Sequence, residues 1–198
     1  MVELLTENAP RQVDVNFLDW VHIYVDASFD PEGYSGVGGL ILDHAGQCLG
    51  CFSEEVPPEL VAKLKKDEQK TVIFELEGLA IAAALHTFGV FAKGRRAVVF
   101  TDNQSAQSCI IKCKSDNRHM NLIVRSVCTA EEKLGLVTWV ERVPSQSNPA
   151  DELSRAKMFE YAGVKATEVN LMKCWMMCTA EVSAKSSQVT GGETRDDI

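Results

Sequence analysis

The sequence lacks the features that mark a membrane or secreted protein. It has no apolar run long enough to span a bilayer, and its first ten residues have neither a basic start nor a long apolar stretch. It also lacks an internal repeat and any excess of positive charge, since the formal net charge is −8. This acidity argues against a protein that holds nucleic acid by charge alone, but not against an enzyme whose carboxylates recruit metal ions to meet phosphates. We expect an intracellular protein, cytoplasmic or nuclear, with no membrane contact.

Disulfide bonds and a structural zinc site are not expected either. The chain has 7 cysteines, an odd number without an export signal, which favours reduced thiols. Cys48, Cys51, Cys174 and Cys178 have spacings that zinc could use, but the first pair falls in a strand-like segment. No histidine stands at a supporting spacing. The 198 residues are enough for one domain with a sizeable core.

Residues 21–26 are predicted to form a strand inside a sheet. β-Branched and aromatic residues dominate the segment, and apolar side chains recur at every second position. The strand ends in Asp26, where a carboxylate is costly unless it is paired or bound to metal. The alternative is that Asp26 only begins the turn over residues 30–33.

A glycine-rich stretch follows at residues 33–39. Strands over residues 37–42 and 47–55, joined by a turn at 43–46, are predicted to complete an antiparallel meander. No helix follows the glycines directly, so we interpret them as serving turns and close packing rather than a phosphate-binding loop.

A charged helix is predicted over residues 59–70 and an apolar helix over residues 71–88. In the second helix, apolar residues fall 3, 4, 7, 8 and 11 positions after Glu77. Glu75 lies on a more mixed stripe. The pattern therefore predicts that Glu77, rather than Glu75, points inward.

Residues 95–102 repeat the pattern of the first strand and end in Asp102. A helix is predicted to start at Asn103 and to run to about residue 112. The alternative is that Asp102 or Asn103 is only the N-cap of that helix. The remaining predicted elements are a helix over 119–134, a strand over 136–143, a turn over 144–149 and a last helix over 150–161 that opens near Asp151.

Four carboxylates thus stand at the ends of predicted elements: Asp26, Glu77, Asp102 and Asp151. The element order is typical of an α/β fold in which helices pack across one sheet and distant strands become neighbours. Carboxylates that meet in this way repel one another, which divalent cations can offset. Oxygen ligands favour Mg²⁺ or Mn²⁺ over zinc, and paired ions of this kind suit displacement at phosphorus.

The motifs around these acids resemble those of ribonuclease H domains. Closest in pattern are the domains attached to reverse transcriptases of hepadnaviruses and of DIRS-like retrotransposons. The resemblance covers about residues 20–162 and rests on the motifs Tyr-Val-Asp26-Ala-Ser, Glu77-Gly-Leu-Ala80, Phe-Thr-Asp102-Asn and Val143-Pro-Ser-Gln-Ser-Asn-Pro-Ala-Asp151-Glu-Leu-Ser-Arg155. The last motif is the most specific.

The resemblance implies a ribonuclease H-like fold, with a five-stranded mixed sheet flanked by helices. Strands 1–3 would be antiparallel, and strands 4 and 5 parallel to strand 1. It implies that Asp26, Glu77, Asp102 and Asp151 bind two Mg²⁺ ions, with Mn²⁺ as a substitute, and cleave the RNA strand of an RNA–DNA hybrid. The residues that it places near the substrate are Ser28, Asn103, Ser147, Asn148 and Arg155.

Two features depart from many relatives. The loop over residues 144–149 has no histidine, and no tryptophan-rich basic protrusion is evident. We therefore expect weak intrinsic affinity for the hybrid, with a reverse transcriptase domain of a parent polyprotein as a possible partner. The predicted organisation is a lead-in over 1–19, the ribonuclease H-like domain over 20–162 and an extension over 163–198, with a short apolar helix at 169–177 and disorder from 183.

Two other functions fit the same fold. One is another nuclease or a transposase, although the Asn-Pro-Ala-Asp-x-x-Ser-Arg ending favours ribonuclease H. The second is a non-catalytic module that serves as a scaffold or binds a partner. Loss of one acid would indicate such a module, and none of the four is lost.

Overall fold

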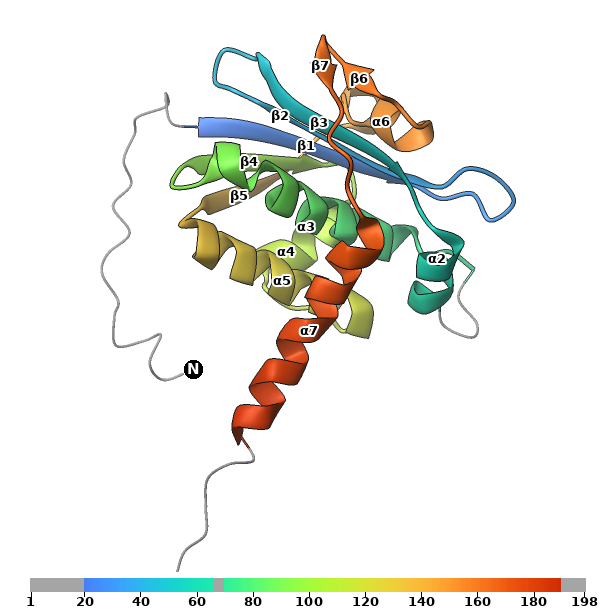
Figure 1. Ribbon diagram of the computed structural model, residues 1–198, viewed down its shortest axis with the longest axis vertical. Coiled ribbons are helices and arrows are strands. Elements are labelled where there is room, and N and C mark those ends of the chain that lie inside the picture. Colours follow the sequence, from blue (N-terminus) through green and yellow to red (C-terminus); the bar gives the residue numbers. More distant parts are fainter. Residues whose placement is uncertain (1–19, 66–69, 190–198) are drawn as a thin grey trace, which may run out of the picture.

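The computed structural model describes residues 20–65 and 70–189 (Figure 1). The predicted lead-in over 1–19, residues 66–69 and residues 190–198 lie outside this part. The elements are β1 Trp20–Ser28, β2 Gly36–Leu42, β3 Cys48–Glu55, α2 Pro58–Leu64, α3 Ile73–Ala92, β4 Arg96–Thr101, α4 Gln104–Ile111, α5 Arg118–Leu134, β5 Val137–Arg142, a 3₁₀ turn Ser145–Ser147, α6 Asp151–Arg155, β6 Glu160–Tyr161, β7 Val164–Lys165 and α7 Leu171–Val189.

Five strands form one mixed sheet in the order β3-β2-β1-β4-β5. β1 pairs antiparallel with β2 and parallel with β4, and β4 pairs parallel with β5. The parallel pairs are possible because helical crossovers connect their strands. The predicted fold class is confirmed, including the direction of every strand in this sheet.

Helix α3 is the apolar centre of the domain. It packs on the sheet and against α5 and α7, and every residue from Glu75 to Leu85 is buried (Figure 1). Within the described residues, α3 is also the helix whose length and composition would suit a membrane span, but 72% of its apolar window is buried inside the fold. This burial is that of a core helix, since a surface helix keeps a polar stripe.

Helix α6 lies on the opposite face of the sheet, over β1 and β2 (Figure 1). It can approach closely because β2 carries glycines. A Cβ atom on Gly36 would lie 2.2 Å from the carbonyl oxygen of Ser154, and one on Gly38 would lie 2.5 Å from the carbonyl carbon of Leu153. The glycines thus serve close packing, as predicted, and their partner is a helix.

Two predicted helices end early. α2 stops at Leu64 rather than near residue 70, with Lys65 already extended. The helix predicted over 150–161 ends at Arg155, because Ser53 of β3 binds the chain that follows. Its hydroxyl donates to the Ala156 carbonyl oxygen at 2.8 Å and accepts from the Met158 N–H at 2.9 Å. These bonds hold an extended segment that leads into the β6–β7 hairpin.

Helix α7 is part of the fold. Its tryptophan, Trp175, meets the ring of His119 edge-on, with the ring centroids 5.4 Å apart. The short helix predicted at 169–177 is confirmed, but α7 is longer and continues past residue 183, where composition predicts disorder. Up to Ala180, where burial is described, the residues of α7 buried in the main core are Leu171, Cys174, Trp175 and Cys178.

Candidate metal centre

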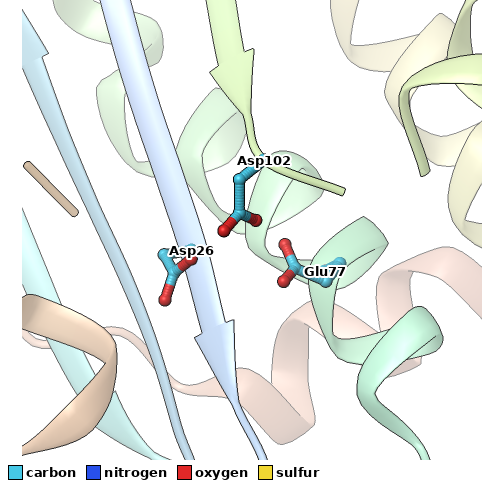
Figure 2. A group of neighbouring side chains, drawn as sticks. All are labelled: Asp26, Glu77 and Asp102. Carbon is cyan, nitrogen blue, oxygen red and sulfur yellow. The ribbon is translucent and has the colours of Figure 1, made fainter. Parts of the chain in front are cut away.

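Three carboxylates meet where β1, β4 and α3 come together. One oxygen atom from each of Asp26, Glu77 and Asp102 lies within 4.8 Å of the other two (Figure 2). Asp26 extends from β1, Asp102 directly follows β4, and Glu77 reaches them from α3. We call this group the acidic cluster. The inward direction predicted for Glu77 is correct.

The strand register explains why two of the acids meet. β1 and β4 are parallel, with Tyr24 opposite Phe100, so Asp26 and Asp102 stand at the same level two residues further on. The rings of Tyr24 and Phe100 stack with their centroids 4.6 Å apart. β4 ends at Thr101, whereas β1 continues to Ser28 beside β2. The strands therefore part at the level of the acids, and Glu77 approaches at that point.

Burial makes the cluster unfavourable as three free anions. It raises the pKa of Asp26 to about 7, and the negative charges of Asp102 and Asp151 add to the rise. Burial likewise raises the pKa of Glu77 to about 9, with the charges of Asp26 and Asp102 as the next causes. A cation among these oxygens would favour the charged forms and reverse both shifts.

One oxygen of the cluster has no partner within the described structure. Oε2 of Glu77 is fully buried and makes no hydrogen bond. A buried polar atom without a partner is costly, and such atoms in native proteins often mark a bound ion or water. The donor set consists of carboxylate oxygens, which suit Mg²⁺ or Mn²⁺. The residues present therefore fit a hard divalent cation.

Asp26 is held from the far side by the segment that contains α6. The Ser154 hydroxyl donates a hydrogen bond to Oδ2 of Asp26. The side-chain amide of Asn148 lies 3.5 Å from Oδ1 of Asp26 and 2.9 Å from the carbonyl oxygen of Val25, to which it donates. Ser154 and Asn148 are both buried. Asn148, predicted near the substrate, thus positions Asp26 in this structure.

The fourth predicted acid lies outside the acidic cluster. Asp151 opens α6 and accepts two hydrogen bonds from Arg155, from Nε at 2.6 Å and from Nη2 at 2.7 Å. Asp151 is nevertheless near Asp26, because the Ser154 hydroxyl is within hydrogen-bond distance of both Oδ2 of Asp26 and the Asp151 carbonyl oxygen. The negative charge of Asp151 contributes to the raised pKa of Asp26. The structure therefore brings three of the four acids together and pairs the fourth with a cation.

The other residues predicted near the substrate have different surroundings. Oδ1 of Asn103 accepts the N–H groups of Ser105 and Ala106 and so caps α4, which leaves Asp102 free of that role. Ser147 is exposed in the 3₁₀ turn. Ser28 and Arg155 line one recess of about 460 Å³ beside the acidic cluster, together with Ala27, Phe29, Asp30, Tyr34 and Ile73.

Glu75 is also buried, although its stripe is mixed. Oε1 of Glu75 accepts a hydrogen bond of 2.7 Å from the side-chain amide of Asn117, the N-cap of α5. This glutamate therefore ties α3 to the start of α5, and Glu77 belongs to the cluster.

Ser154 is the residue of the site that sequence reasoning missed. It stands inside the most specific motif, between Asp151 and Arg155, but its partner Asp26 is 128 positions away. The Asp151–Arg155 pair had a local signal, since oppositely charged residues four apart on a helix are neighbours.

Solved ribonuclease H structures share this fold. The chain aligns with RNase H1 from the archaeon Halobacterium salinarum NRC-1 at a TM-score of 0.55 and 16% identity, over 68% of this chain and 94% of that chain. It aligns with LC11-RNase H1, isolated from compost by a metagenomic approach, at a TM-score of 0.55 and 19% identity, over 69% and 93%. A structure of LC11-RNase H1 in complex with an RNA/DNA hybrid aligns at 0.54, with 19% identity, over 68% and 93%. Fold and acidic cluster together define a protein with the ribonuclease H fold.

Part of the sequence also matches a family of known domains. Residues 59–125 match the model of the RNase H-like domain found in reverse transcriptase. This segment includes Glu77 and Asp102. The predicted resemblance to ribonuclease H domains of reverse transcriptases is confirmed by this match. A search of curated proteins finds no match.

Proposed function

We propose that the protein is a ribonuclease H, a metal-dependent endonuclease that hydrolyses the RNA strand of RNA–DNA hybrids. The observation that carries the proposal is the acidic cluster with its buried, unpartnered Oε2 of Glu77. A site built only to stabilise the fold would pair that oxygen, because an unsatisfied buried group costs about 1–3 kcal/mol.

The chain's own residues supply the ligands and their support. Asp26, Glu77 and Asp102 would hold Mg²⁺, and Asp151 would join them after it leaves Arg155. Bound Mg²⁺ would activate a water and stabilise the leaving oxygen at phosphorus. Ser154 and Asn148 fix the orientation of Asp26. Ser28 and Arg155 face the recess beside the cluster, where they would meet the RNA strand.

The substrate class and origin extend this proposal. The RNA/DNA hybrid bound to LC11-RNase H1 supports a hybrid substrate. The family match supports derivation from a retroelement and association with a reverse transcriptase domain, and the motifs favour the hepadnavirus and DIRS-like types. An intracellular location accords with these partners.

A cleavage assay tests the proposal. A labelled RNA–DNA hybrid is incubated with the protein in Mg²⁺, in Mn²⁺ and in excess EDTA, beside the matching RNA and DNA duplexes. Metal-dependent cleavage of the hybrid's RNA strand alone is expected. Cleavage of all three duplexes would indicate another nuclease, and metal binding without any cleavage would indicate a non-catalytic module.

A further inference from the structure

The Asp151–Arg155 pair engages both carboxylate oxygens of Asp151. Each carboxylate oxygen accepts one N–H of the guanidinium group, at 2.6 and 2.7 Å. Asp151 nevertheless lies close to Asp26, because the Ser154 hydroxyl is within hydrogen-bond distance of both Oδ2 of Asp26 and the Asp151 carbonyl oxygen. A fourth carboxylate therefore stands beside the acidic cluster and is held away from it by a cation.

The Asp151–Arg155 pair is weak enough for another anion to replace Asp151 as the partner of Arg155. The side chain of Arg155 is 63% exposed and that of Asp151 is 27% exposed. Exposed ion pairs contribute only about 0.2–1 kcal/mol. The two N–H groups that face Asp151 match two oxygens of a phosphate equally well, since the guanidinium fork binds both groups in the same bidentate way.

The surroundings of Arg155 offer a place for that phosphate. Arg155 lines the recess of about 460 Å³ beside the cluster, and Ala27 and Ser28, which follow Asp26 directly, line it as well. Within the described residues, the recess contains Asp30 as its acid and Arg155 as its cation. A phosphodiester that enters here meets the guanidinium group next to the acids.

We propose that Arg155 is a positioning residue that exchanges the Asp151 carboxylate for a backbone phosphate of the nucleic-acid substrate. The exchange frees Asp151 to join Asp26, Glu77 and Asp102. Substrate binding and completion of the four-carboxylate metal site are then one coupled event. This inference rests on the proposed function, because it assumes that the cluster binds metal.

Coupling of this kind is reciprocal and can be measured without catalysis. Mn²⁺ binding is titrated by calorimetry on the full chain, with and without a 2′-O-methyl RNA–DNA hybrid, whose RNA strand lacks the free 2′-hydroxyl. In the wild type the hybrid should tighten Mn²⁺ binding about tenfold or add a second ion. In Arg155→Ala, Asp151 is free from the start, so Mn²⁺ should bind about tenfold more tightly without hybrid. In this variant the hybrid should increase the Mn²⁺ affinity only slightly further.

Lys157→Ala is the matched control, because Lys157 forms an ion pair with Glu54 in the same segment but away from the cluster. It should keep the wild-type response to the hybrid. Arg155→Lys tests whether the bidentate geometry of the guanidinium group is needed. A lysine keeps the charge but not this geometry, so the effect of the hybrid on Mn²⁺ binding should be smaller than in the wild type. Melting temperatures of all variants should stay close to that of the wild type.

The outcomes separate the two proposals. If the wild type binds Mn²⁺ and Arg155→Ala gives the same affinity and the same response to hybrid, the exchange is overturned while the metal site stands. If the wild type binds no Mn²⁺ with or without hybrid, both proposals are overturned.

Discussion

Ser154 on α6 donates a hydrogen bond to Oδ2 of Asp26 on β1, although 128 positions separate the two residues. Asn148, three residues before Asp151, approaches the other oxygen of Asp26 at 3.5 Å. The segment with the most specific motif thus holds Asp26, the first of the four predicted acids, from the face of the sheet opposite α3. The orientation of Asp26 depends on a helix of only 5 residues.

Loss of the hydrogen bond from Ser154 to Asp26 should lower both the stability of the protein and its affinity for metal. Ser154→Ala leaves a buried carboxyl oxygen without its donor, which costs about 1–3 kcal/mol. Since the Ser154 hydrogen bond lowers the pKa of Asp26, its loss should also weaken metal binding at neutral pH. Urea unfolding and Mn²⁺ titration measure the two effects. Ser145→Ala, in the exposed 3₁₀ turn, is the control and should change neither.

Gly38→Ala should act on the same helix through packing. Its Cβ would lie 2.5 Å from the Leu153 carbonyl carbon and 2.7 Å from the Ser154 nitrogen, so α6 must move outward. Overpacking of this kind costs about 1–3 kcal/mol. Gly50→Ala on β3 is the control, because its nearest contact would be 3.4 Å. Equal stability of the two variants in urea would show that α6 adjusts freely.

Asp102→Asn should lower the rate of hybrid cleavage by orders of magnitude. It should leave the fold intact or slightly more stable. The change weakens a metal ligand and removes one negative charge from the metal-free cluster. The N-cap of α4 is Asn103, so the helix itself loses nothing. Cleavage in Mg²⁺ and the melting temperature in EDTA are compared with those of the exposed control Asp116→Asn. Near-normal cleavage would contradict the assignment of Asp102 as a ligand.

In the metal-free protein, stability should fall as the pH rises from about 4 to about 9. The pKa values of Asp26 and Glu77 in the folded state are raised to about 7 and about 9 from 3.8 and 4.5. In this range the folded state holds protons that the unfolded state has released, so the free energy of unfolding decreases with pH. This contribution is complete below about pH 4 and is lost as the pH passes the two raised values.

Urea unfolding in EDTA at pH 5 and pH 8.5 measures this loss, and Mg²⁺ should restore stability mainly at pH 8.5. Glu77→Gln cannot titrate, so its stability should change less between the two pH values than that of the wild type. If stability changes equally with pH in both proteins, a group other than Glu77 is responsible for the pH dependence.

Truncation after Ala180 should leave hybrid cleavage intact, because the shortened chain keeps the core residues Leu171, Cys174, Trp175 and Cys178 of α7. Trp175→Ala in the full chain is the contrasting change. The indole is 6% exposed and packs against His119, so its loss should cost about 3–5 kcal/mol of stability. Melting temperature and cleavage are measured for both proteins. Loss of activity on truncation alone would mean that residues after 180 contact the substrate.

The fold was predictable because its strands carry clear local patterns. Apolar alternation and a terminal carboxylate marked β1 and β4, and the hairpin between β2 and β3 had ordinary turn residues. The end of α6 was not predictable, since it depends on one hydrogen bond donated and one accepted by Ser53, which lies 103 and 105 positions before its two partners. Tertiary contacts here override the helical preference of residues 156–161.

The acids were predictable and their neighbours were less so. Glu77 followed from helical periodicity, because the stripe that it shares is apolar throughout. The pairing of Asp151 with Arg155 follows from a four-residue spacing, but its competition with the metal site is a matter of distance that the sequence does not give. The contact between Ser154 and Asp26 crosses the whole domain and leaves no local pattern.

The central position of β1 has a consequence for folding. Asp26, Glu77 and Asp102 leave the ribosome well before Asn148 and Ser154, which restrain the first of them. Contacts between such distant segments form slowly, since a long loop must close before they add stability. A nascent or truncated chain that ends before α6 therefore carries the acids without their restraint. The restraint on Asp26 is thus a property of the finished domain, and it forms only when the last motif has docked.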